Sequence, residues 1–359
     1  MHTLCAFCKK AHPAFPPGAC FICNNQLEQL EEWIAKAVAL LGTNERFVLS
    51  TRVPKQWLAR EEELLDRSLN AETIKQTVNQ HIVAALQSQG KRYAMEAPVR
   101  LEMDFFHGLV QVHREPRFFF GRYKKFTLLS QSRWICKVCQ GKGCGECKGK
   151  GKYYDAVEEV IGEPFKQASK AEDYILHASG REDVDALNTA GRPFVLELVN
   201  PEERVDVPAV QEEINRSGKV KVEGMRIVRR NFVTLIGDSH FDKEYEAEVV
   251  LEKPIDKERV YELEKKVPLV LEQQTPQRVA HRRADLVRKR EVKKLKIIGC
   301  EGTRAHVSVT AEAGTYIKEF ISGDDGRTNP SMSALLGTGV RCEKLTVTKI
   351  YDGFLELVA

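Results

Sequence analysis

Two segments near the start of the chain carry apolar residues at the three- and four-residue steps of an amphipathic helix. This pattern predicts one helix over residues 27–41, ended by Gly42, and another over residues 74–86, while charged sequence at 61–67 is also typical of a helix. Short apolar or alternating runs predict strands. These lie at residues 47–49, 99–103, 109–112, 174–176, 194–199 and 247–251. The mixture indicates an α+β protein, and the apolar stripes are its expected core.

The length and composition describe a globular chain with more than one core. At 359 residues the chain exceeds the usual size of a single domain, so we expect two or three. Hydrophobic residues at 42% and charged residues at 30% exclude a disordered tail, a collagen-like repeat and a membrane channel. No apolar run approaches eighteen residues, and the opening sequence lacks the features of a signal peptide. We therefore expect a cytoplasmic protein that does not bind membranes.

Eight of the ten cysteines form four Cys-x-x-Cys pairs. In a reducing compartment such pairs favour metal ligation over disulfides, and four thiolates make the closed tetrahedral site of a structural zinc ion. We predict two such sites. The first set is Cys5, Cys8, Cys20 and Cys23, and the second is Cys136, Cys139, Cys144 and Cys147. The alternative for the second set is that its pairs divide between partners or bind no metal.

Two segments concentrate positive charge, although the net charge is only +4. Residues 114–152 hold eleven Lys or Arg against two acids and interleave six aromatic residues, and residues 278–296 hold nine Lys or Arg against two acids. Cations attract phosphates and aromatic rings stack on unpaired bases, so this mixture indicates RNA binding. The alternative is a solvated face beside a few core aromatics.

Residues 177–194 form a predicted loop between two strands, and they carry an acidic cluster between arginines. Glu182, Asp183 and Asp185 lie between Arg181 and Arg192. Loops that leave a sheet and present charged groups are common places for chemistry. Two arginines argue against a calcium site because they already neutralise the acids. Spacing alone does not rank the three acids.

Three motifs in this order resemble those of the pseudouridine synthase superfamily. Residues 180–183 resemble its G-R-x-D signature, residues 243–247 its K-x-Y-x-A motif, and residues 314–318 its G-T-Y-I-R/K segment. The resemblance implies that Asp183 is the catalytic aspartate, that Tyr245 packs on the target uracil, and that Lys318 pairs with Asp183. It also implies that Arg181 fills the place of the everted base, unless it pairs with a neighbouring acid, and that Tyr316 forms a wall of the site.

The wider sequence resembles the archaeal and eukaryotic tRNA pseudouridine synthase family that acts on the T-arm. The resemblance rests on residues 180–194, 275–285 and 314–330 and on the N-terminal cysteines. It implies a zinc knuckle at 1–26, a THUMP-like α/β RNA-binding domain at 27–153 that includes the second cysteine set at 136–147, and a catalytic domain at 154–359. The catalytic domain would be built on a mixed, mainly antiparallel sheet.

The resemblance also implies an activity. The expected reaction is isomerisation of uridine to pseudouridine at position 54, 55 or both of tRNA, with structural zinc, no organic cofactor and no obligatory protein partner. Further substrate-binding candidates are arginines of the predicted loop at 177–194 and of the basic segment at 278–296. They are Arg192, Arg278, Arg282 and Arg283.

Two other functions compete with this interpretation. A catalytically inert, zinc-dependent tRNA-binding or RNA-chaperone protein would be expected to have lost at least one of Asp183, Tyr245 and Lys318, and all three are present. The fragment at residues 136–147 also resembles the cysteine repeats of the DnaJ chaperone family, but the sequence has no J-domain.

Overall fold

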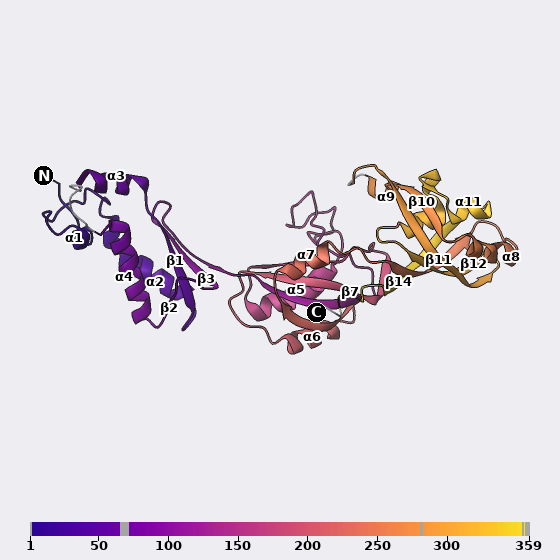
Figure 1. The fold of residues 1–359 in the computed structure, drawn as a ribbon, viewed down its shortest axis with the longest axis horizontal. Helices are drawn as coiled ribbons and strands as arrows, with labels where there is room; N and C mark the ends of the chain where they lie inside the picture. The colour runs from indigo at the N-terminus through magenta and orange to yellow at the C-terminus, as the bar shows by residue number, and fades with distance from the viewer. Residues whose placement is uncertain (1, 65–71, 281–282, 354, 356–359) are drawn as a thin grey trace. The chain divides into compact units, whose positions relative to one another are not determined.

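The computed structural model describes residues 2–64, 72–280, 283–353 and 355. Contacts divide the chain into two compact units. Unit 1 comprises Met1–Pro116 with Val199–Glu202, and unit 2 comprises Arg117–Leu198 with Glu203–Ala359. Each unit has its own sheet and its own hydrophobic core (Figure 1).

Unit 1 is a four-stranded sheet with helices. Its strands are β1 (Arg46–Arg52), β2 (Arg92–Tyr93), β3 (Val99–Asp104) and β4 (Leu109–Arg114), in the spatial order β2-β1-β3-β4. β1 is parallel to β2 and β3, while β3 and β4 are antiparallel. Its helices are α1 (Cys8–Ala11), η1 (Gln26–Gln29), α2 (Leu30–Leu40), α3 (Lys55–Leu64) and α4 (Ile74–Ser88). The single helix predicted at 27–41 is therefore wrong in its first turn, which is a 3-10 helix.

The core of unit 1 joins its helices to its sheet. Thr73 caps α4 by accepting a hydrogen bond from the backbone of Gln76, and the helix then buries the apolar stripe that the sequence predicted. The first four cysteines belong to the same buried cluster as these helices. The described part of this segment, residues 2–26, consequently contributes to the unit 1 core, whereas the sequence suggested a separate knuckle. The part of the predicted helix at 61–67 beyond Leu64 lies outside the described residues.

Unit 2 is built on a large sheet with helices on its faces. Its strands are β5 (Arg117–Lys125), β6 (Asp173–Ala178), β7 (Ala186–Val199), β8 (Val220–Val228), β9 (Lys243–Leu251), β10 (Leu269–Gln274), β11 (Val287–Glu301), β12 (Arg304–Ala311), β13 (Thr328–Asn329) and β14 (Val340–Ile350). Its helices are α5 (Val157–Ser169), α6 (Val207–Arg216), α7 (Asn231–Gly237), α8 (Lys257–Tyr261), η2 (Glu262–Lys266), α9 (Gln277–Ala280), α10 (Ile317–Ser322), η3 (Asp324–Gly326) and α11 (Met332–Leu336).

The strands of unit 2 form one mixed sheet. Their order is β13-β10-β11-β12-β9-β14-β7-β5-β8, with β6 also paired to β7. Along this path β14 and β7 are parallel and the other neighbours are antiparallel. The α+β class and the mixed, mainly antiparallel sheet are therefore confirmed.

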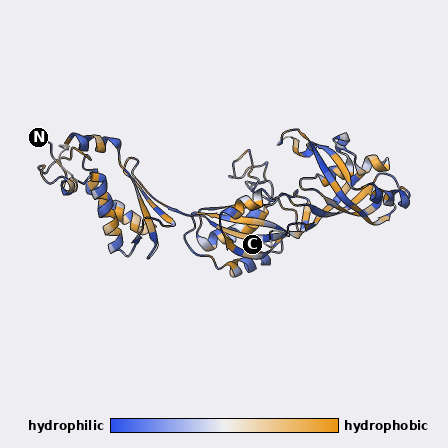
Figure 2. Ribbon diagram, in the orientation of Figure 1, coloured by the Kyte–Doolittle hydropathy of each residue, from blue (hydrophilic) through white to orange (hydrophobic). Residues whose placement is uncertain are grey.

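Two clusters of apolar side chains bury the faces of this sheet. One cluster packs α5 and α6 against strands β5 to β8, and Gly162 of α5 is needed there because a Cβ atom would lie 2.1 Å from the ring of Tyr174. The other packs α10 and α11 against β9, β12 and β14. Figure 2 shows hydrophobic and hydrophilic positions interleaved along these elements, as expected where one face of each is buried.

The division between the units differs from the boundary suggested at residues 153 and 154. β5 pairs with β7 and β8, so its hydrogen bonds make it an internal strand of the unit 2 sheet. The segment that follows it, including the second cysteine set, belongs to unit 2 as well. The sequence missed this because a strand can pair with partners far away in the chain.

Two motif boundaries also changed. β7 begins at Ala186, so the second half of the loop predicted at 177–194 is strand, and only residues 179–185 remain a loop. β9 begins at Lys243, so the K-x-Y-x-A motif lies within a strand.

None of the helices in the described part of the chain has the length and apolarity needed to cross a membrane.

Candidate active site

A cavity of about 370 Å³ in unit 2 collects the three motifs. Its walls come from the loop after β6, the start of β9, the segment of α9, the turn before α10, and β14. Asp183, Tyr245 and Lys318 all line it, as the motif resemblance predicted. Arg181, Arg192, Arg278, Arg283 and Tyr316 line it too. Arg282 lies outside the described residues. A cavity of this size is typical of a small-ligand or single-nucleotide site.

Two cations face the Asp183 carboxylate. Arg278 Nη1 lies 2.7 Å from Asp183 Oδ1, and Lys318 Nζ lies 3.8 Å from Asp183 Oδ2. The arginine is therefore the nearer partner, although the motif resemblance had assigned the pairing to the lysine. Arg278 lies on the short helix α9, and the sequence indicated it only as a substrate-binding candidate, because spacing gave no signal for its contact with Asp183.

Each of these cations is shared with a second acid. Lys318 Nζ donates a hydrogen bond of 2.6 Å to Asp185 Oδ1, and Arg278 Nε donates one of 2.6 Å to Glu319 Oε1. Burial raises the pKa of Asp185, but the hydrogen bond and charge of Lys318 outweigh it and leave that pKa lowered. Burial lowers the pKa of Arg278, but the hydrogen bond and charge of Glu319 more than compensate and raise it. The five charges thus alternate in sign, and the three central ones, on Lys318, Asp183 and Arg278, line the cavity.

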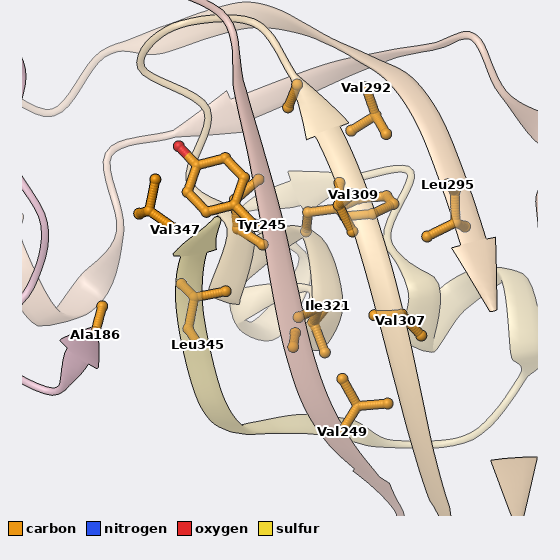
Figure 3. Packing of buried hydrophobic residues seen from close by; sticks show 14 of the residues in the cluster. Ala186, Tyr245, Val249, Val292, Leu295, Val307, Val309, Ile321, Leu345 and Val347 are labelled. Atoms are coloured by element: carbon orange, nitrogen blue, oxygen red, sulfur yellow. The ribbon is translucent and has the colours of Figure 1, made fainter. Parts of the chain in front are cut away.

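Aromatic side chains form the opposite wall. Tyr245 is only 9% exposed, and burial raises its pKa to about 12, so its hydroxyl stays protonated at neutral pH. Figure 3 shows its ring beside Val347, with the hydroxyl directed away from Leu345 and Ile321. Tyr316 accepts a hydrogen bond of 3.0 Å from Arg283 Nη1 at its hydroxyl. The wall combines a flat apolar face with polar groups at its edge.

The loop that carries Asp183 is fastened from β5 and the segment after it. Lys125 is fully buried, and its Nζ donates hydrogen bonds to the carbonyl oxygens of Asp183 at 2.9 Å and Val184 at 3.2 Å. A third hydrogen bond from Lys125 Nζ, to Leu129 O at 2.9 Å, connects Lys125 to the chain after β5. Burial, opposed in part by the charge of Glu182, lowers the pKa of Lys125 to about 8.

A buried ion pair holds the other end of the loop. Arg192 Nε lies 2.6 Å from Glu182 Oε2, in an orientation that makes an ion pair without a hydrogen bond, and both side chains are almost fully buried. Tyr123 donates a hydrogen bond of 2.9 Å to Glu182 Oε1, and Gln131 Nε2 donates one of 2.9 Å to Gly180 O. Gly180 itself has a φ of 75°, which favours glycine.

The positions of the predicted arginines separate two kinds of role. Arg192 donates a hydrogen bond to Ser179 O at 2.6 Å and is 1% exposed. It therefore fixes the start of the loop, and almost none of its side chain is accessible to RNA. Arg181 is exposed at the edge of the cavity, with its guanidinium carbon 5.3 Å from the centroid of the Trp134 ring. Sequence reasoning missed Tyr123, Lys125 and Gln131, since nothing in a single sequence links β5 to a loop sixty residues later.

Both cysteine sets have the geometry of a tetrahedral metal site. A tetrahedron with metal–sulfur distances of about 2.3 Å has edges of about 3.8 Å. Sγ atoms lie 3.7 and 3.6 Å apart in the first set and 3.8 Å apart in three pairs of the second. Backbone amides donate to these sulfurs, including Cys8 N to Cys5 and Gly151 N to Cys147. All four thiols of each set converge, so both sets fit a zinc ion.

A carboxylate between two cations, beside an aromatic wall in a polar cavity, is the arrangement of an enzyme site that acts on a polar ligand.

Comparison with known proteins also indicates an enzyme. Residues 118–351 match the family model described as "Pus10, C-terminal". Relatives named tRNA pseudouridine synthase Pus10 match along almost the whole chain. The one from Methanothrix thermoacetophila is 38% identical, over 92% of this chain and 76% of the relative, and the one from Archaeoglobus fulgidus is 36% identical, over 92% and 94%. The chain belongs to the Pus10 family.

Solved structures give a weaker likeness. The archaeal box H/ACA sRNP Nop10–Cbf5 complex is 19% identical with a TM-score of 0.31, over 54% of this chain and 43% of that one. The H/ACA RNP bound to a substrate RNA containing 2′-deoxyuridine is 16% identical with a TM-score of 0.33, over 64% and 47%. These scores are too low to bear on the site.

Proposed function

We propose that the chain is a tRNA pseudouridine synthase that isomerises uridine in the T-arm, at position 54, 55 or both, with Asp183 as its catalytic residue. The observation that carries the proposal is the Asp183 carboxylate held between Arg278 and Lys318 in a cavity walled by Tyr245. Membership of a family whose curated relatives are named tRNA pseudouridine synthase supports the reaction and the class of substrate.

The reaction needs no group from outside the RNA. The N1–C1′ bond breaks, the uracil turns, C5 bonds to C1′, and the C5 proton leaves as N1 gains one. A carboxylate beside C1′ can attack that carbon, stabilise an oxocarbenium-like centre, or remove the 2′ proton. Asp183 is 30% exposed and faces the cavity, so it fits each of these routes.

The other residues would hold the everted nucleotide. Extruding a base costs a few kcal/mol, and stacking on an aromatic face returns about 1–3 kcal/mol. Tyr245 offers that face. Arg181, exposed at the cavity edge, would occupy the place that the base leaves. We assign Arg192 a positioning role, because its guanidinium is already occupied by Glu182 and Ser179.

The proposed function is tested with purified protein and an unmodified tRNA transcript. Tritium at C5 of uridine should be released to solvent, and base-resolved mapping should find pseudouridine in the T-arm. Two further transcripts, each with cytidine replacing one of the two T-loop uridines, should show which position is modified, because the product at a modified position is lost when its uridine is replaced. Tight binding without tritium release would instead favour the catalytically inert RNA-binding protein.

Removal of the buried Lys125 ammonium group should slow the reaction. We expect Lys125→Met to lower kcat by roughly ten- to a hundredfold with little change in KM, because three carbonyl groups lose their donor and Asp183 loses its fixed position. Lys124→Met is the matched control, since the neighbouring lysine pairs with Glu223 and makes no contact with the loop. Equal kcat values for the two variants would remove Lys125 from the site.

The remaining features also belong to this proposal. We propose that unit 1 is the THUMP-like RNA-binding domain, supported by its sheet and helices, and that both cysteine sets bind structural zinc. We retain the cytoplasm as the compartment because these thiols must stay reduced to bind metal. Metal analysis of the intact protein should find about two zinc ions per chain.

A further inference from the structure

The segment from Trp134 to Tyr153, named here the cysteine ribbon, lies between β5 and α5 and contains no helix or strand (Figure 1). An isolated bridge pairs Ile135 with Lys152, and Tyr153 N donates a hydrogen bond of 3.0 Å to Trp134 O. Cys136 N donates one of 2.8 Å to Gly151 O. Outside these contacts at its base, the ribbon folds around the four converging sulfurs of the second cysteine set.

Glycines let the ribbon fold back closely on itself. A Cβ atom on Gly143 would lie 2.7 Å from Gly149 O, and one on Gly151 would lie 2.3 Å from Gly141 O, so neither position tolerates a larger residue. All four of these glycines have positive φ. Three large apolar side chains of the ribbon are exposed, Ile135, Val138 and Tyr153, and its other exposed positions are mainly lysines and glycines.

The ribbon carries a row of exposed cations. Lys137, Lys142, Lys148 and Lys150 are exposed, and no acidic side chain in the described part of the chain pairs with any of them. Glu146 is the one acid of the ribbon. Even with four thiolates around a divalent ion, the five lysines of the ribbon leave it positive. Exposed ammonium groups without acidic partners are what a phosphate backbone binds.

The base of the ribbon lies next to the cavity. Trp134 lies 5.3 Å from the guanidinium of Arg181, which lines the cavity, and its ring packs edge-on against Tyr154 at 5.5 Å. Arg181 therefore connects the loop of Asp183 to the first residue of the ribbon. A nucleic acid strand that enters the cavity passes the aromatic end of the ribbon.

We propose that the cysteine ribbon is a metal-dependent phosphate-binding arm of unit 2, which holds the backbone of the RNA beside the cavity. The inference rests on the proposed function for its ligand, a tRNA. It assigns the second cysteine set a role in binding RNA in addition to folding. The metal acts through the shape of the ribbon, because the lysines are spread along a segment that the sulfurs hold together.

The first test replaces the four exposed ribbon lysines together by glutamine in the full chain. Binding of the tRNA transcript is then measured at several salt concentrations. Each lost phosphate contact lowers the slope of log K against log salt by about 0.7–0.9, so the loss of four contacts should lower it by roughly 3. The matched control makes the same change in charge on four exposed lysines around α8 and η2 that do not line the cavity. They are Lys253, Lys257, Lys265 and Lys266.

The second test removes the metal from the ribbon alone. Cys139→Ser with Cys144→Ser should lower the zinc content by one ion per chain, and it should reduce the salt slope about as much as the lysine variant does. An unchanged slope in the lysine variant, or an equal loss in the α8 control, overturns the proposal. So does a cysteine variant that loses one zinc ion yet binds RNA with the wild-type slope.

The two proposals fail in different ways. If wild-type protein releases tritium from the transcript while the ribbon variants bind as wild type does, the arm is wrong and the proposed function stands. If wild-type protein neither binds nor modifies tRNA, the proposed function fails and the arm fails with it. A thermal melt of each variant excludes loss of the fold as the cause.

Discussion

Asp183→Asn is expected to abolish pseudouridine formation while it leaves the fold and RNA binding intact. The amide has nearly the shape of the carboxylate but lacks the charge and the nucleophilic oxygen, so the rate should fall by about a thousandfold or more. Stability should change little, since Asp183 is partly exposed and such ion pairs contribute about 0–1 kcal/mol. Single-turnover assays with saturating enzyme measure the chemical step directly.

The structure supplies a close control for this variant. Asp185 lies two residues further along the loop, is 66% exposed and shares Lys318 with Asp183. Asp185→Asn changes the same charge near the same cation, yet it should lower the rate by less than about tenfold, because Asp185 does not line the cavity. An inactive Asp185→Asn together with an active Asp183→Asn would exchange the roles of the two acids.

Loss of Arg278 is expected to have the second largest effect. Its guanidinium is 2.7 Å from Asp183, against 3.8 Å for Lys318, and Coulomb attraction falls with distance. Arg278→Met would leave Glu319, which is 4% exposed, without its partner, and an orphaned buried charge costs about 3–5 kcal/mol of stability. The variant to assay is therefore Arg278→Met with Glu319→Gln, which removes both charges. We expect its rate to fall by about a hundredfold.

Lys318→Met provides the comparison. Its other partner, Asp185, is exposed, so the substitution should cost little stability. We expect a decrease of about tenfold, smaller than that of the Arg278 variant, with additional loss when the two are combined. If Lys318→Met proves the more damaging, the lysine is the principal cation, as the motif alone had suggested.

The sequence located the candidate site well because motifs keep their residues adjacent. G-R-x-D, K-x-Y-x-A and G-T-Y-I-K each lie within five residues, and the structure brings all three to one cavity. The cysteine pairs were equally readable, since two ligands three residues apart already define half of a tetrahedral site. The resemblance to the family was confirmed by the family model over residues 118–351 and by relatives that match along most of the chain.

The sequence was less informative where function depends on strand pairing. The family resemblance placed residues 117–153 with the N-terminal domain, yet β5 of that segment pairs with β7 and β8 of the other unit. Charge density is a local property, whereas membership of a sheet is decided by hydrogen bonds to distant partners. The same pairing brings Lys125 beneath the loop of Asp183.

The amino-acid order by itself determined which residues are the candidates for the reaction and for metal binding, because those groups are specified by type and by short spacing. The tertiary structure decided which cation lies nearest to Asp183, which arginine is buried, and what fastens the catalytic loop. Lys125 and Asp183 are 58 positions apart in the chain, and Asp185 and Lys318 are 133 apart. Only the folded sheet brings such residues within hydrogen-bonding distance.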